Sequence, residues 1–181
     1  VQKVGERLAA MRPGPPLEET SDTGAIVSPQ QLDKVLSYIE IGRAEQARLV
    51  TGGERLTAGD LANGNFVTPA LFADVDPAGR LATEEIFGPV LAAIPFGRYD
   101  EAVAIANSVE YGLTASVFTR DLRTALAFAR DVDAGYVWVN ETSRHFLGAP
   151  FGGVKNSGVG REEDLEEIES YTQLKSVNIR F

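Results

Sequence analysis

The chain has 181 residues, 44% hydrophobic and 24% charged, which suits one domain, or one domain with an appended element, that has its own core. Its net charge of −9 opposes binding to a phosphate backbone, so nucleic acid is not an expected partner. With no cysteine and a single histidine, His145, the sequence excludes disulfides, thiolate zinc sites, multi-histidine metal sites and a cysteine nucleophile of its own.

The sequence also bears on location. Its longest apolar runs are far too short to span a membrane, so no membrane partner is expected. The first residues lack the apolar region and cleavage pattern of a signal peptide, and a cytoplasmic protein is expected. The chain begins with Val1 rather than methionine and opens directly in a helical pattern, which indicates processing or a piece of a longer protein.

Two helices are predicted near the start of the chain. The first is a short amphipathic helix that ends before Pro13 and carries an apolar stripe of Val1, Val4, Leu8 and Met11. The second begins at Ser28, which can act as the N-cap, with Pro29 at the first helical position and Gln31 completing a capping box. Its predicted buried face consists of Leu32, Val35, Leu36 and Ile39.

Strands and helices alternate after the second helix. A strand is predicted at residues 48–51, ending at Gly52, and an extended segment at 66–68, turning at Pro69. Further strands are predicted at residues 90–95, 113–119 and 136–140, and helices at 100–109 and 121–133. The second of these helices directs Leu122, Ala125, Leu126 and Ala129 inward. This β-α-β-α-β order, with continuous apolar strands, predicts an α/β fold with a parallel sheet covered on both faces.

The C-terminal part is less regular. Residues 141–160 form a long glycine-containing loop, a kind of segment that is usually functional or disordered. A polar helix is predicted at residues 162–169. Residues 171–181 look extended, with Val177 and Ile179 on one face and Lys175 interrupting the pattern, and they are predicted to form an edge or intersubunit strand.

Two segments carry residue types suited to ligand binding. The segment 150–162 contains four glycines but lacks the spacing of a phosphate-binding loop or dinucleotide fingerprint, so a structural turn and a ligand contact both remain open. Glu84 and Glu85 precede a predicted buried strand, where parallel sheets commonly place ligands. A carboxylate there can accept hydrogen bonds from ribose hydroxyls and Phe87 can pack on a ring. The alternative is a solvated acidic turn with Phe87 in the core.

Four segments decide between these alternatives when they are taken together. They are Glu84-Glu-Ile-Phe-Gly-Pro-Val90, Tyr111-Gly-Leu-Thr-Ala-Ser-Val-Phe-Thr119, Gly135-Tyr-Val-Trp-Val-Asn140 and Pro150-Phe-Gly-Gly-Val-Lys-Asn-Ser-Gly-Val-Gly-Arg-Glu162. In this order and spacing they resemble consecutive motifs of the NAD(P)-dependent aldehyde dehydrogenase superfamily. The resemblance implies the parallel-sheet three-layer catalytic domain of that family, incomplete at its N-terminal side. Residues 1–170 would be the C-terminal portion of that domain and 171–181 an oligomerisation strand, which implies a homo-oligomer.

The resemblance assigns cofactor and proton-transfer roles residue by residue. In the family, the glutamate immediately before Ile-Phe-Gly-Pro holds the nicotinamide ribose and the phenylalanine packs near the nicotinamide, which implies Glu85 and Phe87. Glu162 matches a glutamate proposed in parts of the family to serve a proton path. The structural alternative for Glu162 is a carboxylate at a helix N-terminus, stabilised by the helix dipole.

The resemblance also implies a substrate site. Phe151 matches an aromatic residue that lines the family's substrate tunnel, and residues 141–149 match the loop that shapes it. Within this loop His145 occupies an often aromatic position, flanked by Ser143 and Arg144. His145 is expected as a substrate contact rather than a general base, because a lone histidine is more often structural than catalytic. Arg144 is expected to favour a polar or anionic aldehyde.

The implied reaction needs more than this chain. In the family a cysteine thiolate attacks the aldehyde, hydride passes to NAD or NADP, and a glutamate-activated water releases the acid. Both residues lie N-terminal to the segment that matches Val1, so the chain alone is predicted to be inactive. A parallel sheet that lacks its leading strand exposes an apolar edge, so the chain alone is also predicted to self-associate or rearrange near its first helix. The main alternative is a stand-alone assembly module that lost its chemistry. An unrelated α/β nucleotide-binding protein requires all four motif matches to be coincidence.

Overall fold

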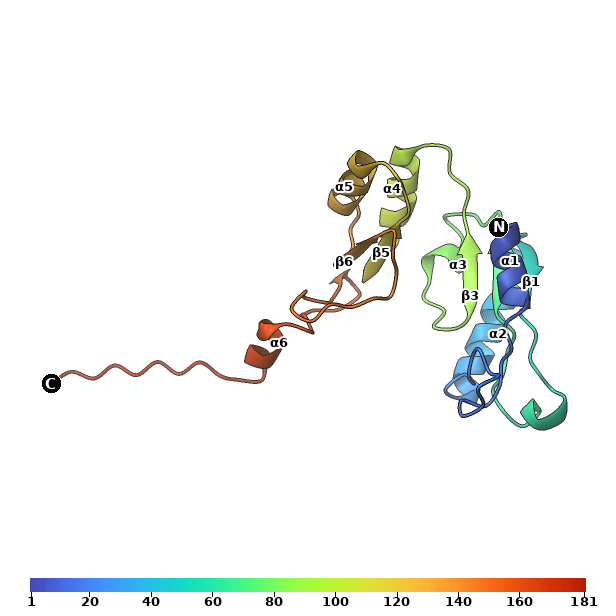
Figure 1. Ribbon diagram of the computed structural model, residues 1–181, viewed down its shortest axis with the longest axis horizontal. Helices are drawn as coiled ribbons and strands as arrows, with labels where there is room; N and C mark the ends of the chain where they lie inside the picture. The colour runs from blue at the N-terminus through green and yellow to red at the C-terminus, as the bar shows by residue number, and fades with distance from the viewer. The chain divides into compact units, whose positions relative to one another are not determined.

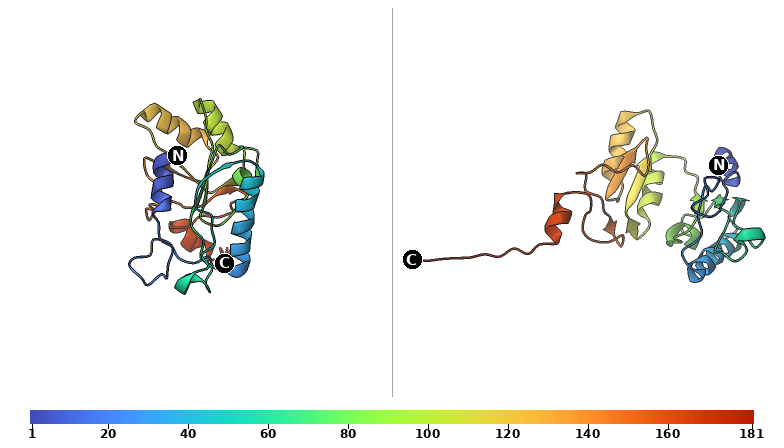
Figure 2. Two further views of the ribbon diagram at one scale, coloured as in Figure 1. Left: turned by 90° about the vertical axis from the view of Figure 1, so that its right-hand side faces the viewer. Right: turned by 60° about the horizontal axis from the view of Figure 1, so that its bottom comes forward.

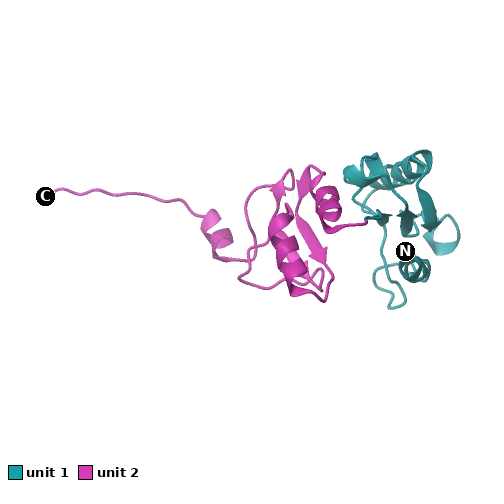
Figure 3. Cartoon of the chain, turned by 90° about the horizontal axis from the view of Figure 1, so that it is seen from above, with its two compact units in different colours: residues 1–96 teal, residues 97–181 magenta.

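The chain forms two compact units. The computed structural model describes residues 1–181, with one unit spanning Val1–Phe96 and the other Gly97–Phe181 (Figure 3). Helices and strands alternate along both units (Figures 1 and 2). The predicted α/β class is therefore confirmed.

A three-stranded sheet organises the first unit. Its strands are β1 (Arg48–Thr51), β2 (Ala70–Ala73) and β3 (Val90–Ala93), in the order β1-β2-β3. β2 and β3 are parallel along all four residues, whereas β1 is antiparallel to β2. Two short helical segments, η1 (Gly59–Leu61) and α3 (Arg80–Thr83), lie in the connections between the strands.

The central strand β2 was not predicted. The sequence pattern indicates a turn at Pro69, but the chain passes directly from Pro69 into β2, whose four residues are all buried. Phe72 belongs to the core that α2 covers, and Leu71 lies on the opposite face, near Gly5 of α1. Because helices cover both faces, the strand shows no polar alternation, and four apolar residues are too few to reveal a period.

Helix α2 (Pro29–Ala44) forms the main core of the first unit. Leu32, Val35 and Ile39 are almost completely buried, which confirms the predicted inward face. Ser28 caps the helix as predicted, because its hydroxyl accepts the backbone N–H of Gln31 at 3.1 Å. The side chain of Gln31 does not complete a capping box, and it bonds elsewhere instead.

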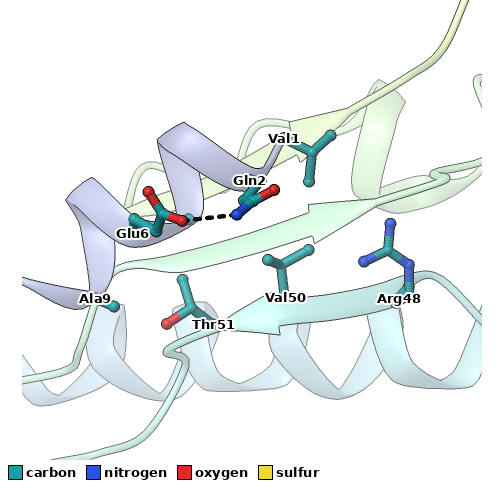
Figure 4. A pocket seen from close by; sticks show the side chains of 8 residues that line it. Val1, Gln2, Glu6, Ala9, Arg48, Val50 and Thr51 are labelled. Carbon is teal, nitrogen blue, oxygen red and sulfur yellow. Dashed lines mark hydrogen bonds between the residues drawn. The ribbon is translucent and has the colours of Figure 1, made fainter.

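Helix α1 (Gln2–Ala9) contacts the sheet through an unexpected face. Gly5 is its buried residue, whereas Val1 and Val4 of the predicted apolar stripe are exposed. The absence of a side chain at Gly5 lets Val50 of β1 come close. An open groove of about 550 Å³ remains between α1 and β1 (Figure 4), lined by Val1, Gln2, Gly5, Glu6, Ala9, Arg48, Val50 and Thr51.

The second unit contains two small two-stranded sheets. β5 (Thr114–Val117) and β6 (Tyr136–Val139) are parallel along all four residues, as predicted. β4 (Tyr111–Gly112) pairs antiparallel with β7 (Val154–Lys155), which lies within the segment predicted as loop. A two-residue pairing leaves no periodic signal in the sequence, so it could not be predicted.

Helix α4 (Tyr99–Asn107) precedes β4, and helix α5 (Leu122–Asp131) connects β5 to β6, both close to their predicted bounds. They are joined through Asp131, whose carboxylate accepts the hydroxyl of Tyr99 at 2.8 Å and whose carbonyl accepts the side-chain amide of Asn107 at 2.8 Å.

The predicted inward face of α5 is correct at only one position. Ala125 is 2% exposed, but Leu122 and Leu126 are 70% and 63% exposed, and Ala129 is also exposed. The physical reason is the narrowness of a two-stranded parallel pair, which covers only the centre of a helix face and leaves the side chains beyond it in solvent.

The C-terminal helix α6 (Leu165–Ser170) begins three residues later than predicted. Asp164 caps it by accepting the backbone N–H of Glu167 at 3.2 Å. Residues 171–181 form no strand within the chain and are exposed throughout (Figure 1). The predicted intersubunit pairing requires a second copy and stays a prediction.

Candidate functional site

Two adjacent carboxylates after α3 have different surroundings. Glu84 accepts hydrogen bonds from the Arg80 guanidinium, at 2.9 Å from both Nε and Nη2, and from the Tyr38 hydroxyl at 2.6 Å. The Arg80 bonds first, and then the Tyr38 bond, lower the pKa of Glu84 to about 2. Glu85 is exposed and makes no hydrogen bond within the chain. Only Glu85 therefore has both carboxylate oxygens available for a ligand.

The backbone that follows Glu85 is held by α2. The side-chain amide of Gln31 donates to the carbonyl oxygen of Ile86 at 2.9 Å and to that of Phe87 at 3.1 Å. Ile86 is buried in the core, and Gly88 lies so close to Val35 that a Cβ there would be 2.3 Å from Val35 Cγ2. The turn at residues 86–88 is thus fixed by the hydrogen bonds from Gln31, by the burial of Ile86 and by the close packing of Gly88 against Val35.

Phe87 lies in a conformation that phenylalanine rarely adopts. Its φ is +57°, and the residue is 75% exposed. Such a left-handed backbone costs about 1–3 kcal/mol for a residue other than glycine and persists only where the surroundings impose it. The exposed ring excludes the alternative that places Phe87 in the core. The turn instead presents a carboxylate and a ring to solvent, separated by one residue.

In the second unit, the loop 141–149 is held by hydrogen bonds from two directions. The Trp138 indole of β6 donates to the carbonyl of Arg144 at 2.7 Å, and the backbone N–H of Gly148 donates to the carbonyl of Glu163 at 2.7 Å. The Nδ1 atom of His145 lies 2.7 Å from a carboxylate oxygen of Glu163. These contacts fix the part of the loop that carries the expected substrate residues.

His145 belongs to a group of four rings, the aromatic cluster, formed by Tyr136, Trp138, His145 and Phe151. The His145 ring lies 4.4 Å from that of Phe151 and 5.9 Å from those of both Tyr136 and Trp138, nearly parallel to Tyr136. The sequence motifs point to His145 and Phe151 but not to the other two. Their signal was the alternation along β6, which places residues two apart on one face of a strand.

Ser143 and Arg144 are both exposed. Ser143 has a φ of +61° and only a weak contact, 3.4 Å, with the Thr142 hydroxyl. The Arg144 side chain is 68% exposed. Its Nη1 lies 3.7 Å from a carboxylate oxygen of Glu141, and its Cζ lies 5.1 Å from the centre of the Phe146 ring. Arg144 thus keeps an exposed positive charge beside the aromatic cluster.

The glycine-containing segment 150–162 folds back on itself. Phe151 and Glu162 exchange backbone hydrogen bonds of 2.9 and 2.7 Å, and the Arg161 guanidinium donates to the carbonyls of Gly153 and Gly160 at 2.8 and 2.7 Å. A cavity of about 320 Å³ remains, and Phe151 and Glu162 are among its lining residues. The segment therefore forms a structural turn and also borders a cavity.

Glu162 is not a helix N-terminal carboxylate, because α6 begins only at Leu165. Its side chain is exposed. The structural alternative predicted for Glu162 is therefore wrong.

The predicted site residues fall into two groups. Glu85 and Phe87 share one turn of the first unit, whereas the loop residues, Phe151 and Glu162 belong to the second. No group of three or more acidic or histidine side chains is arranged to hold a metal ion, and none of the helices combines the length and apolar character needed to cross a membrane.

Comparison with known proteins identifies the family to which the chain belongs. Residues 1–177 match the aldehyde dehydrogenase family. The chain is 47% identical over 171 residues to the aldehyde dehydrogenase tropH of Talaromyces stipitatus, covering 93% of the chain and 33% of that protein. It is 47% identical over 177 residues to a betaine aldehyde dehydrogenase of Cereibacter sphaeroides, covering 98% of the chain and 36% of that protein.

Solved structures agree with the sequence matches. HpcC from Thermus thermophilus superposes with a TM-score of 0.91 at 44% identity, over 96% of this chain and 34% of that one. The indole-3-acetaldehyde dehydrogenase AldA of P. syringae, in complex with NAD+ and IAA, gives 0.92 at 44% identity, over 99% and 36%. The chain spans about a third of the length of the relatives it matches. Within that span, it belongs to the aldehyde dehydrogenase family.

Proposed function

We propose that the intact protein oxidises an aldehyde to a carboxylic acid with NAD or NADP, and that this chain supplies cofactor contacts and walls of the substrate site. The observation that carries the proposal is the Glu85–Phe87 turn. It presents an unpaired carboxylate and an exposed ring at a backbone conformation that α2 holds in place. Because the chain belongs to the aldehyde dehydrogenase family, NAD or NADP is the ligand that we propose for this turn.

The residues of the turn fit part of a nicotinamide site. The Glu85 carboxylate can accept hydrogen bonds from the two hydroxyls of a ribose. The exposed Phe87 ring offers an apolar face against which a planar heterocycle can pack. NAD or NADP, when bound, accepts a hydride from the substrate. In this arrangement Glu85 orients the ribose and Phe87 limits the positions that the nicotinamide ring can take.

The second unit supplies the substrate wall. Phe151 and His145 form its aromatic part, and Ser143 and Arg144 its polar rim. The exposed Arg144 guanidinium favours an aldehyde with a polar or anionic group. Substitution of Arg144 by alanine in the full-length enzyme should lower kcat/KM for an anionic aldehyde more than for a neutral one. An unchanged preference between the two would refute this role.

The nucleophile comes from outside this sequence, which contains no cysteine. We infer that the intact enzyme reacts through a cysteine thiohemiacetal and that Glu162, exposed beside the cavity, serves a proton path. Loss of the nucleophile of a covalent mechanism costs on the order of a millionfold in rate, so the chain alone is inactive.

An alternative is a stand-alone assembly module that keeps the family's interface without its chemistry. The exposed apolar residues of the segment 171–181 favour an assembly role in either case, since they could pair with a second copy in a homo-oligomer. The reading frame upstream of Val1 separates the two. An in-frame extension with a cysteine and a dinucleotide-binding domain supports the enzyme, and a start codon near Val1 supports the module.

The direct test of the cofactor role is Glu85→Ala in the full-length enzyme. We expect a higher KM for NAD(P) and a lower kcat/KM, because the ribose loses its hydrogen-bond acceptor. Glu19→Ala is the matched control, because Glu19 lies in the same unit, is also exposed and also makes no hydrogen bond through its side chain. Equal kinetics for the two variants would refute the assignment.

A further inference from the structure

Glu163 is an unusual residue for its position. Its φ is +68°, in the left-handed region that favours glycine. One of its carboxylate oxygens, Oε1, meets Nδ1 of His145 at 2.7 Å, while the other, Oε2, is buried without a hydrogen-bond partner. Both features oppose stability, and such local conflicts concentrate at functional sites.

The surroundings of Glu163 hold its carboxylate against His145. Its backbone N–H donates to the Glu167 carboxylate at 2.7 Å, and its carbonyl accepts the N–H of Gly148 at 2.7 Å. The first contact fixes the residue to α6, and the second fixes it to the loop that carries His145. The side chain therefore reaches the imidazole from a backbone that is held on both sides.

This contact selects one tautomer of the imidazole. An ionised carboxylate can only accept, so Nδ1 of His145 must carry the proton that joins the two groups. In the neutral ring, Nε2 is then the acceptor. Nε2 makes no hydrogen bond within the chain, and the side chain is 36% exposed, with Phe151 against its ring.

We propose that Glu163 is a positioning residue that holds His145 as a hydrogen-bond acceptor in the substrate wall, and that among neutral aldehydes the preferred substrates are aryl aldehydes with a hydroxyl group. The proposal rests on the aldehyde oxidation proposed above. The ring of the substrate packs against Phe151 and the aromatic cluster, and its hydroxyl donates to Nε2 of His145. Neutral aldehydes without a donor lose this bond but keep the packing.

The tautomer can be tested without any activity. His145 is the single histidine of the chain, so isotopically labelled imidazole nitrogens give one assignable pair of NMR signals. At a pH above the titration of the ring, read from the same spectra, we expect a protonated Nδ1 and an unprotonated Nε2. Glu163→Leu should remove this preference and Glu163→Gln should keep part of it, since an amide oxygen still accepts. A protonated Nε2 in the native chain, or an unchanged pattern in Glu163→Leu, would overturn the proposal.

Specificity is tested in the full-length enzyme with two aldehydes of the same shape, para-(hydroxymethyl)benzaldehyde and para-ethylbenzaldehyde. One hydrogen bond predicts a three- to tenfold higher kcat/KM, in order of magnitude, for the hydroxyl compound. Glu163→Leu and His145→Phe should each bring the ratio close to one, while Glu166→Leu, at an exposed position of α6, should leave it unchanged.

The outcomes separate this inference from the proposed function. If Glu163→Leu lowers kcat/KM equally for both aldehydes, its role is merely structural and the inference is wrong. If the native enzyme oxidises both aldehydes equally well, the substrate class is wrong although the enzyme assignment stands. If no aldehyde is oxidised at all, the proposed function fails, and the NMR measurement still decides whether Glu163 sets the tautomer.

Discussion

Replacement of Gln31 by alanine tests how the cofactor turn is held. The change removes the two hydrogen bonds that the amide donates to the carbonyls of Ile86 and Phe87, one part-buried and one exposed. Each such bond contributes about 0.5–1.5 kcal/mol, and exposure of the second places their sum near 1–2 kcal/mol, in round figures. Without them the left-handed Phe87 can relax, so the turn should open locally while α2 stays folded.

Hydrogen exchange of the backbone amides of Ile86, Phe87, Gly88 and Val90 measures this opening. A loss of about 1–2 kcal/mol corresponds to a roughly five- to thirtyfold larger open fraction and an equal increase in exchange rate. Gln30→Ala is the matched control, because Gln30 is the adjacent glutamine of α2, exposed and without a hydrogen bond.

A second variant separates the turn from the helix. Gln31→Glu should keep the helix start, since glutamate completes a capping box with Ser28, but it cannot donate to the two carbonyls. Exchange should therefore increase in the turn and not in α2. Equal exchange rates for Gln31→Ala and Gln30→Ala in the turn would refute the reasoning.

Three further predictions concern stability and association. The pKa of Glu84 lies near 2 in the folded chain, below its ordinary value, so its hydrogen bonds stabilise the fold at a pH above that ordinary value and lose their effect as the pH falls toward 2. Acid titration followed by circular dichroism should show a flatter dependence of stability on pH for Glu84→Gln, and an unchanged dependence would contradict this. Asp121→Ala removes the cap of α5 and should cost about 0.5–2 kcal/mol in urea unfolding, whereas equal midpoints would argue against the cap. The exposed Leu122 and Leu126 should make the chain self-associate at high concentration, and replacement of both by serine should reduce the association measured by light scattering. A monodisperse monomer of the native chain would contradict this.

The fold was predictable where one face of an element is apolar and the other polar. The inward face of α2 and its Ser28 cap follow directly from residue spacing. β2 could not be found in this way, because both its faces are covered and it has only four residues. The inward face of α5 was misjudged because spacing tells which residues share a face, and not how wide the surface beneath them is.

The sequence indicates which residues to expect at the site, but not the contacts that hold them. Family motifs point to Phe87 and His145, yet no motif indicates that Gln31 holds the backbone at Phe87 or that Glu163 contacts His145. In each pair the two residues are distant in the sequence: Gln31 and Phe87 are 56 residues apart, and His145 and Glu163 are 18 residues apart. Long-range side-chain hydrogen bonds of this kind have no local period, so only the three-dimensional arrangement reveals them.

The most direct test of the central claim is the rate of NAD(P)H formation from an aldehyde by two proteins. One is the 181-residue chain alone, and the other is the same chain joined to the upstream two thirds of the Cereibacter sphaeroides betaine aldehyde dehydrogenase, checked for folding by circular dichroism. We predict no turnover by the chain alone and NAD(P)-dependent turnover by the folded fusion, lowered by Glu85→Ala. Turnover by the isolated chain, or a folded fusion whose activity is indifferent to Glu85, would contradict the account.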